Sequence, residues 1–401
     1  MVKNYNGAEG SCVLAASRKC LFAIGANFPS QCCLTSPQKI QHNLSTKIGR
    51  LVPIAGDTEM QSKKLARKLS RRLLIRGAAG VTAATILHWP AEAAEFSYKY
   101  GTVLPITHPM TARIAQAAVK IKEATGGRFE YAVYPSSALG GDTAMVAQAI
   151  SGALQMYSLA GDILAPRAPA AGIMSVGFAF PGYGPNWAAM DGELGLWCRN
   201  LAEKFGLYSL PKAFDHGFRN ITTRNKPINT PEDLHGFKIR LPVAPTLIAL
   251  FKSLGAAPTA LNLGEVYSAL QTGIVDGQEN PLQLIDEAKF YEVQKYVSMT
   301  GHVWIGIHCA FNVLAWKKLP GSIQDTVAEI LTESATLARA DWVRNDETVT
   351  QTLKDRGMIF NTPEIQPFRK VASQNGYYTE LKQRMGEEPW ALLEKYTGKL
   401  S

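Results

Sequence analysis

Residues 129–159 have the sequence FEYAVYPSSALGGDTAMVAQAISGALQMYSL, in which two strand patterns flank a helix pattern. Phe129–Val133 predicts a strand, Asp142–Ser151 predicts a helix that ends at a glycine, and Ala153–Leu159 predicts a second strand. Two strands joined through a helix run parallel in one sheet. This stretch therefore favours an α/β fold.

The same alternation extends on both sides of this stretch. Phe96–Val103 is rich in strand-forming residues, and Thr111–Thr125 carries apolar residues at helical spacing before two glycines. Gly206–Leu210 and Phe218–Thr223 continue the strand pattern. The order β-α-β-α-β predicts a largely parallel sheet covered by helices.

The second half of the chain repeats this arrangement. Thr230–Asp233 forms a capping box for a short helix, and Phe237–Leu241 follows as a strand with Arg240 on its polar face. Gly264–Gln271 predicts a helix and Ile274–Gly277 a short buried strand. This helix–glycine–strand unit resembles the earlier one, a pattern that two similar lobes would leave.

One long helix is predicted near the C-terminal end. Ser322 begins a second capping box, and apolar residues then recur at helical spacing up to Gly357. About 35 residues give a helix of roughly 50 Å, which is longer than one small domain. We expect this helix to cross two lobes.

Composition and charge exclude several classes of protein. Apolar residues make up 46% of the chain, which excludes global disorder. The sequence contains no run of 18 apolar residues, which excludes an integral membrane protein. Residues 1–93 hold 13 Lys and Arg against 4 Asp and Glu, which accounts for the whole net charge of +9. The remaining residues are neutral overall, so the sequence does not indicate a nucleic-acid-binding domain.

The basic leader has the order of an export signal. The basic run Lys63–Arg76 contains the pair Arg71-Arg72, the weakly apolar Gly77–Trp89 follows, and an A-x-A site ends at Ala93. The paired arginines are similar to those of twin-arginine signals, which predicts a signal over residues 60–93 and a periplasmic location. The alternative is a basic amphipathic helix of the folded protein.

Residues 1–59 precede this signal and show no periodicity. We expect them to be a non-native or disordered extension, with Met60 as the true start. The extension contains four cysteines whose spacing does not fit a metal site. Only Cys198 and Cys309 remain after cleavage, and the sequence does not decide whether they pair.

Signatures of catalysis and cofactor binding are absent from the sequence. It contains no nucleophile elbow, phosphate-binding loop, zinc-protease motif or C-x-x-C pair. We therefore predict no cofactor, no metal and no enzymatic activity. Four histidines could each line a pocket, although a structural role is the alternative for each: His108, His216, His302 and His308.

Arginines near strand ends indicate a site for an anion. Arg240 lies at the end of one predicted strand and Arg219 within another, and Asn280 comes just before a strand-ending proline. A guanidinium pairs with a carboxylate through two parallel hydrogen bonds, and ligands of open α/β sheets bind beyond the carboxyl ends of strands. A surface salt bridge is the alternative for each arginine.

Four motifs resemble those of the solute-binding proteins of tripartite ATP-independent periplasmic (TRAP) transporters. They are YPSSALGG at 134–141, FKIRLP at 237–242, VDGQENP at 275–281 and FYEVQKY at 290–296, in the order and at the spacing of that family. The resemblance covers essentially all of Phe96–Leu400. It implies a bilobal fold like that of periplasmic binding proteins, with two mixed or parallel sheets, flanking helices, hinge strands and a long bridging helix.

The resemblance also implies the lobes and the site. Lobe I would comprise residues 94–216 and 306–345, and lobe II residues 217–305 and 346–401. Arg240 would pair with the carboxylate of an organic acid, assisted by Arg219 and Asn280. The partners would be the small and large membrane subunits of a TRAP permease, with the chain acting as a monomer or homodimer.

Other candidates would shape the rest of the pocket. Gln278 shares a motif with Asn280, His108 could line the cleft, and Trp187, Trp304 and Phe180 could wall it, although core packing is the alternative for the aromatic residues. If they line it, an aromatic or 2-oxo monocarboxylate is the expected ligand. Two alternatives remain for the function, namely an exported enzyme that acts on carboxylic acids through Glu279 and His302, and a sensory binding protein.

Overall fold

The computed structural model describes residues 93–400, so the predicted extension and nearly all of the predicted signal lie outside the described residues. The strands in chain order are β1 (Phe96–Gly101), β2 (Phe129–Tyr134), β3 (Met156–Ala160), β4 (Leu207–Ser209), β5 (Phe214–Thr223), β6 (Lys238–Leu241), β7 (Ala257–Ala260), β8 (Gly277–Asn280), β9 (Tyr296–Asn312) and β10 (Ile359–Asn361).

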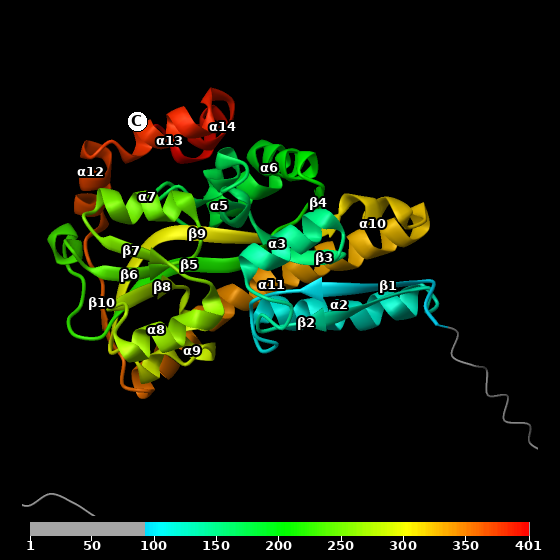
Figure 1. Cartoon of the computed structure of the whole chain (residues 1–401), viewed down its shortest axis with the longest axis horizontal. Coiled ribbons are helices and arrows are strands. Elements are labelled where there is room, and N and C mark those ends of the chain that lie inside the picture. Colours follow the sequence, from blue (N-terminus) through cyan, green and yellow to red (C-terminus); the bar gives the residue numbers. More distant parts are fainter. Residues whose placement is uncertain (1–92, 401) are drawn as a thin grey trace, which may run out of the picture. The chain divides into compact units, whose positions relative to one another are not determined.

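Helices surround these strands (Figure 1). They are α2 (Pro109–Ala124), α3 (Asp142–Ser151), α4 (Gly161–Leu164), α5 (Tyr183–Asp191), α6 (Glu193–Lys204), α7 (Pro245–Ser253), α8 (Val266–Thr272), α9 (Leu282–Glu287), α10 (Val313–Lys318), α11 (Gly321–Asp355), α12 (Ile365–Gln374), α13 (Tyr377–Met385) and α14 (Glu387–Thr397). Short 3₁₀ turns are η1 (Pro169–Ser175), η2 (Pro231–Leu234), η3 (Leu263–Glu265) and η4 (Phe290–Glu292).

The sheet contains two groups of parallel strands, as the mixed α/β prediction requires. In the first strand group β1 pairs in parallel with β2 and β3, and in the second strand group β6 pairs in parallel with β7 and β8. The long strands β5 and β9 lie between the groups in the order β2-β1-β3-β9-β5-β8-β6-β7. Hydrogen bonding along β5 and β9 therefore joins the two expected sheets into one ten-stranded sheet.

The pairing of β5 with β9 shifts register twice, between Arg219 and Ile221 and between Asp215 and Gly217. Asp215 faces Gly306 and Gly217 faces Ile305, so His216 is an extra residue on β5. Such a β-bulge bends a strand and redirects a side chain. Gly217 has a φ of 90°, a left-handed conformation that glycine adopts without strain.

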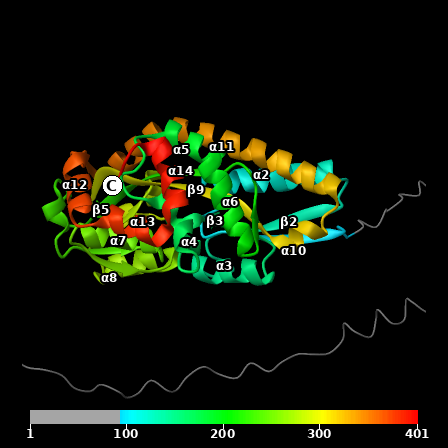
Figure 2. The ribbon, with the colours of Figure 1, turned by 90° about the horizontal axis from the view of Figure 1, so that it is seen from above.

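The predicted long helix is confirmed as α11, which has 35 residues. It packs against α2 beside the first strand group, against β5, and against α9 beside the second strand group, and Figure 2 shows it running along α2. The predicted capping box at Ser322 is wrong, because the N-cap residue is Pro320 and Ser322 lies inside the first turn. The capping box at Thr230 is confirmed, with the Asp233 carboxylate accepting from the Thr230 N–H at 3.1 Å.

One short strand lies three residues later than predicted. The sequence indicated Ile274–Gly277, whereas β8 is Gly277–Asn280. Gly273 ends α8 in a left-handed conformation, and Ile274 is 62% exposed in the turn that follows. The apolar residues that suggested a buried strand therefore belong partly to a turn, and the polar Gln278-Glu279-Asn280 segment forms the strand.

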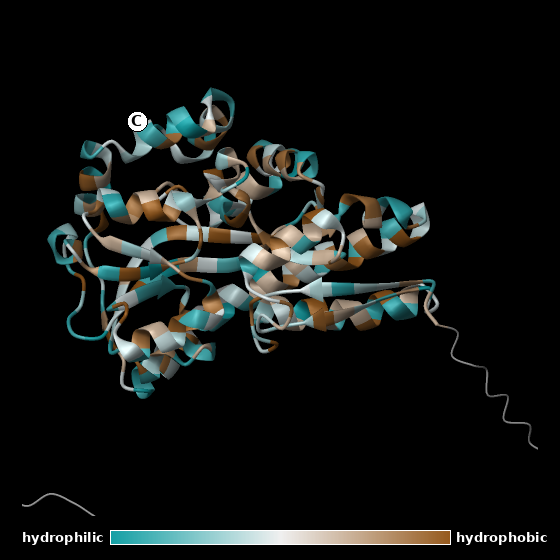
Figure 3. Cartoon of the chain, viewed as in Figure 1, coloured by the Kyte–Doolittle hydropathy of each residue, from teal (hydrophilic) through white to brown (hydrophobic). Residues whose placement is uncertain are grey.

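Hydrophobic packing surrounds the sheet. Figure 3 shows helices with both hydrophobic and hydrophilic residues, as expected when one helix face is buried. The C-terminal helices pack on the rest of the described chain, α12 and α13 on α7, and α14 on α5 and α6. Both Cys198 and Cys309 are free thiols.

Within residues 93–400, no helix is both long and apolar enough to cross a membrane. The same residues contain no cluster of three side chains that could hold a metal ion.

Candidate functional site

A cavity lies between the two strand groups, where β3, β6 and β8 end. The space between its atoms is about 530 Å³, part of it open to solvent. The polar residues that line it are Asp142, Ser158, Asp162, His216, Arg219, Arg240 and Asn280. The apolar ones include Val103, Leu104, Ile163, Leu263, Leu284, Ile305 and Ile307. The cavity thus combines apolar walls with a few polar groups, which is typical of a small-molecule site.

Arg240 supplies positive charge to this cavity. Its side chain is 2% exposed, and the Leu261 carbonyl oxygen accepts from its Nε (3.0 Å) and Nη2 (2.6 Å). Burial, and then the like charge of Arg219, lowers the pKa of Arg240 to about 10, so it stays charged at neutral pH. No carboxylate of the described residues forms an ion pair with Arg240, and Nη1 donates to none of these residues. A ligand anion would supply the missing partner.

Arg219 is the second arginine of the cavity, and it is neutralised by Glu279. Its Nε and Nη2 donate to the two carboxylate oxygens, and Nη2 also donates to the Glu279 carbonyl oxygen at 2.7 Å. His302 Nε2 lies 3.0 Å from the same carboxylate. Burial raises the pKa of Glu279, but Arg219 and His302 overcome this effect and lower it to about 2. The pair fixes the guanidinium while Nη1 remains free of protein partners in the described chain.

Asn280 is the third predicted residue that lines the cavity. Its Nδ2 donates to Oε1 of Gln278, and Nε2 of Gln278 donates to Thr222 Oγ1 at 2.8 Å. Gln278 is fully buried and is not among the residues that line the cavity. The predicted ligand contact of Gln278 is thus replaced in the structure by a contact that orients Asn280.

His108 contacts His216, which lines the cavity, but does not line the cavity itself. It is fully buried and caps α2, because its Nδ1 accepts from the Met110 N–H at 3.3 Å. Its Nε2 lies 3.2 Å from Nδ1 of His216, which lines the cavity. Of the two histidines, His216 therefore lines the cavity. The bulge in β5 that places it there has no clear signal in the sequence.

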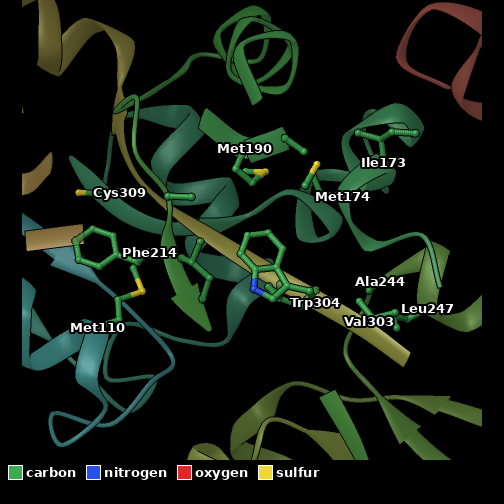
Figure 4. Packing of buried hydrophobic residues seen from close by; sticks show 14 of the residues in the cluster. Met110, Ile173, Met174, Met190, Phe214, Ala244, Leu247, Val303, Trp304 and Cys309 are labelled. Atoms are coloured by element: carbon green, nitrogen blue, oxygen red, sulfur yellow. The ribbon is translucent and has the colours of Figure 1, made fainter. Parts of the chain in front are cut away.

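Trp187 and Trp304 do not line the cavity, and neither does Phe180. Both indole nitrogens donate to Asp215, from Trp187 to Oδ2 at 2.5 Å and from Trp304 to Oδ1 at 3.1 Å. Figure 4 shows Trp304 among buried hydrophobic side chains. The premise for an aromatic ligand is therefore wrong, because Trp304 packs in the core, the half-buried Trp187 packs against that core, and both indoles donate to a buried carboxylate.

The sequence reasoning missed two acidic residues of the cavity. Asp142 begins α3 and accepts from the Tyr157 hydroxyl at 2.7 Å, while Asp162 lies in α4, two residues after the end of β3, and is 3% exposed. Burial raises the pKa of Asp162 to about 6, with Arg219 acting in the opposite direction. The position of Asp162 after a predicted strand was a usable signal, because side chains there face the ligand end of the sheet.

Comparison with known proteins gives the class of this chain. Residues 100–381 match the DctP family, described as "Bacterial extracellular solute-binding protein, family 7", and the chain belongs to this family. The resemblance drawn from the four sequence motifs is thereby confirmed.

Relatives within this family bind different solutes. The chain is 31% identical over 320 residues to the sialic acid-binding periplasmic protein SiaP of Vibrio cholerae, covering 79% of this chain and 94% of SiaP. It is 29% identical over 343 residues to the C4-dicarboxylate-binding periplasmic protein DctP of Rhodobacter capsulatus, covering 82% and 99%. A third relative, the uncharacterized protein y4mM of Sinorhizobium fredii, is 31% identical over 278 residues, and the match spans 67% of this chain and 50% of that longer protein.

Solved structures of TRAP periplasmic solute-binding proteins share the fold. One from Sulfurospirillum deleyianum with bound succinate has a TM-score of 0.71 and 27% identity, and the match covers 76% of this chain and 99% of that one. One from Roseobacter denitrificans with bound L-galactonate has a TM-score of 0.70 and 27% identity, with coverages of 76% and 99%.

Proposed function

We propose that the chain captures an organic acid outside the cytoplasm and delivers it to a TRAP membrane permease. The observation that carries this proposal is Arg240, a buried cation that lines the cavity without a carboxylate partner in the described chain. A ligand carboxylate would accept hydrogen bonds from Arg240, with Arg219 and Asn280 beside it. Glu279 forms its ion pair with Arg219 alone, so Arg240 is the arginine left to pair with a ligand carboxylate.

Capture occurs by closure of two lobes. Of the three lobe boundaries that the resemblance implies, 216/217, 305/306 and 345/346, we place the first two at the bulge in the pairing of β5 with β9, which lies at these residues. The ligand shifts the population toward the closed form by as much free energy as it gains from contacts made only there. Arg219 and Arg240 lie on lobe II, and Asp142 and Ser158 lie on lobe I, so a ligand in the cavity touches both lobes.

Substitution of Arg240 tests this function. We expect Arg240→Ala to weaken binding of carboxylic acids by about 2–5 kcal/mol, which is roughly 30-fold or more in Kd, because the ligand charge would be buried without its partner. The measurement is isothermal titration calorimetry across a panel of mono- and dicarboxylic acids.

Lys238→Ala is the matched control, because Lys238 lies two residues earlier on β6 and is exposed. It should leave affinity unchanged. Equal affinities of the Arg240→Ala variant and the parent protein would contradict the proposed site.

Export and partners complete the proposal. A twin-arginine-type signal over residues 60–93 would direct the chain to the periplasm, where it would meet the small and large membrane subunits as a monomer or homodimer. The family membership supports an extracellular solute carrier. Replacing Arg71-Arg72 by Lys-Lys and measuring the periplasmic fraction tests the export route.

The alternative of an exported enzyme has a specific pair to consider. Glu279 and His302 do lie in contact, at 3.0 Å. Neither lines the cavity, and Arg219 occupies both carboxylate oxygens of Glu279. We therefore assign this pair to holding Arg219 rather than to proton transfer, and we propose that a bound acid is recovered unchanged, which mass spectrometry would check.

A further inference from the structure

Two polar groups of the cavity have no role in the carboxylate contact proposed above. One is the His216 side chain, 4% exposed, and the other is Asp162, 3% exposed. They come from different elements, since His216 lies on β5 and Asp162 lies in α4, two residues after the end of β3. Their hydrogen-bonding character can be worked out from their neighbours.

A relay fixes the tautomer of His216. Nδ1 of His108 accepts from the Met110 N–H, and an accepting ring nitrogen carries no hydrogen. The hydrogen of neutral His108 is therefore on Nε2, which faces Nδ1 of His216 at 3.2 Å. Nδ1 of His216 must then accept, so the hydrogen of His216 is on Nε2.

Both rings are neutral in this relay. Burial lowers the pKa of His108 to about 3. Burial, and then His108 and Arg219, lowers the pKa of His216. No hydrogen bond within residues 93–400 uses Nε2 of His216, so the cavity receives one N–H donor of fixed orientation.

Asp162 supplies the opposite character. Its Oδ1 is buried and has no hydrogen-bond partner in the described chain. The charged groups that act on the pKa of Asp162 are the Arg219 guanidinium and the carboxylates of Asp142 and Glu279. At neutral pH Asp162 is mostly ionised, since its pKa is about 6, and an ionised carboxylate only accepts hydrogen bonds.

We propose that His216 and Asp162 form a second polar subsite that selects carboxylic acids carrying a hydroxyl group. A hydroxyl accepts one hydrogen bond and donates another, so it satisfies both residues. A carbonyl leaves Asp162 without a donor, an ammonium leaves His216 without an acceptor, and a methylene leaves both unpaired. This inference rests on the proposed function, because it places the hydroxyl on the acid that Arg240 binds.

Matched ligands test the selection. Calorimetry would compare lactate with pyruvate, alanine and propanoate, malate with aspartate and succinate, and 2-hydroxybutanoate with butanoate. We expect the hydroxy acid of the best-bound series to bind about tenfold tighter than its partners. Binding without this preference would overturn the inference and leave the proposed function standing. No binding by any of these acids would contradict the proposed function itself.

Substitutions of His216 and Asp162 test whether these two residues cause the preference for a hydroxy acid. His216→Phe and Asp162→Leu should each weaken binding of the hydroxy acid about tenfold and change that of the unsubstituted acid less than about threefold. His308→Phe is the control, because His308 is a buried histidine that does not line this cavity. A preference that persists in both cavity variants would overturn the inference.

Nuclear magnetic resonance tests the relay without any ligand. Long-range ¹⁵N–¹H correlations distinguish the two tautomers, and we expect Nε2–H for both His108 and His216 between pH 5 and 7. His108→Asn keeps a helix-capping side chain but lacks the ring Nε2–H that reaches His216, because its shorter amide lies nearer the backbone, so this positioning residue should release the tautomer of His216. An Nδ1–H tautomer of His216 in the parent protein would overturn the assignment.

Discussion

At the scale of single residues, the contact of Arg219 with Glu279 decides how the site is charged. The carboxylate is fully buried and takes two hydrogen bonds from the guanidinium and one from His302. Removing the charge from one partner leaves the other buried without compensation. The pair therefore matters more for keeping Arg219 in place than for adding net stability.

We predict that Glu279→Gln lowers the free energy of unfolding by about 3–5 kcal/mol, because Arg219 would remain buried as an unpaired cation. Urea denaturation followed by circular dichroism measures this change. Glu380→Gln is the matched control, since Glu380 pairs with Arg384 on the surface and should change stability by less than about 1 kcal/mol. Similar losses in the two variants would contradict the argument.

The sequence predicted part of this site. Arg219, Arg240 and Asn280 could be named because their motifs fix them near strand ends, and the structure brings all three to one cavity. His216 could not be distinguished from other histidines, because its position depends on one extra residue in the pairing of two strands. Trp187 and Trp304 were misjudged because a large aromatic residue fits a core and a pocket wall equally well in a sequence pattern.

At the scale of elements, the bulge in β5 depends on a close approach by α11. A Cβ atom on Gly217 would lie 2.3 Å from the Trp342 ring, and the φ of 90° is unfavourable for other residues. We predict that Gly217→Ala lowers the free energy of unfolding by about 2–5 kcal/mol, combining backbone strain with overpacking. Urea denaturation measures this loss.

Gly236→Ala separates the two contributions. Gly236 has a φ of 69° but nothing within 4 Å of an added Cβ, so only backbone strain applies and a loss of about 1 kcal/mol is expected. If Gly217→Ala lowers the free energy of unfolding by no more than Gly236→Ala does, then the Trp342 side chain moves away from the added methyl group without cost.

Asp215 links the same bulge to pH. Its carboxylate accepts from two indoles and from the Gly217 N–H, yet burial raises its pKa to about 6 from an ordinary value of 3.8. Between these values the folded state binds more protons than the unfolded state, so the stability due to this group falls as pH rises. Asp215 thus makes the protein about 1 kcal/mol more stable at pH 5 than at pH 7.

The variant Asp215→Asn should remove this part of the pH dependence. The measurement is the free energy of unfolding in urea at pH 5 and pH 7, with Asp355→Asn as an exposed control. An unchanged difference between the two pH values would show that Asp215 is not the titrating group.

The elements were predicted more completely than their ends. The helix–strand alternation and α11 followed from periodicity, which reports which face of a segment is buried. The start of β8 did not, because the apolar residues before it sit in a turn and its own residues are polar. Polar residues form a buried strand here because neighbouring side chains bind them, and such long-range contacts are absent from a local pattern.

At the scale of the whole molecule, one contact across the cavity reports on lobe closure. Gly141 at the start of α3 faces Asn262, which follows β7, so that an added Cβ would lie 2.6 Å from the asparagine side chain. Gly141 has an ordinary φ of −72°, so alanine introduces no backbone strain there. We predict that Gly141→Ala weakens ligand affinity about tenfold or more by opposing closure, measured by calorimetry with the best-bound acid of the matched series.

Two further variants make this prediction specific. Gly264→Ala adds a methyl group near the same turn, where nothing lies within 4 Å, and should leave affinity unchanged. The double variant Gly141→Ala/Asn262→Gly removes the obstructing side chain and should restore affinity. Full affinity in Gly141→Ala alone would mean that binding does not need this approach.

The 17 residues of β9 belong to both halves of the sheet, where they pair with β3 and β4 near one end and with β5 and β10 towards the other. Side chains alternate between the faces of a strand, so insertion of one residue in its middle would invert one half while sparing the other. We therefore expect β9 to tolerate an insertion of two residues, or of one residue only where a local β-bulge accommodates it. A single-residue insertion placed at successive positions along β9 should therefore disturb the packing of the half of the sheet that it shifts and leave the other half intact.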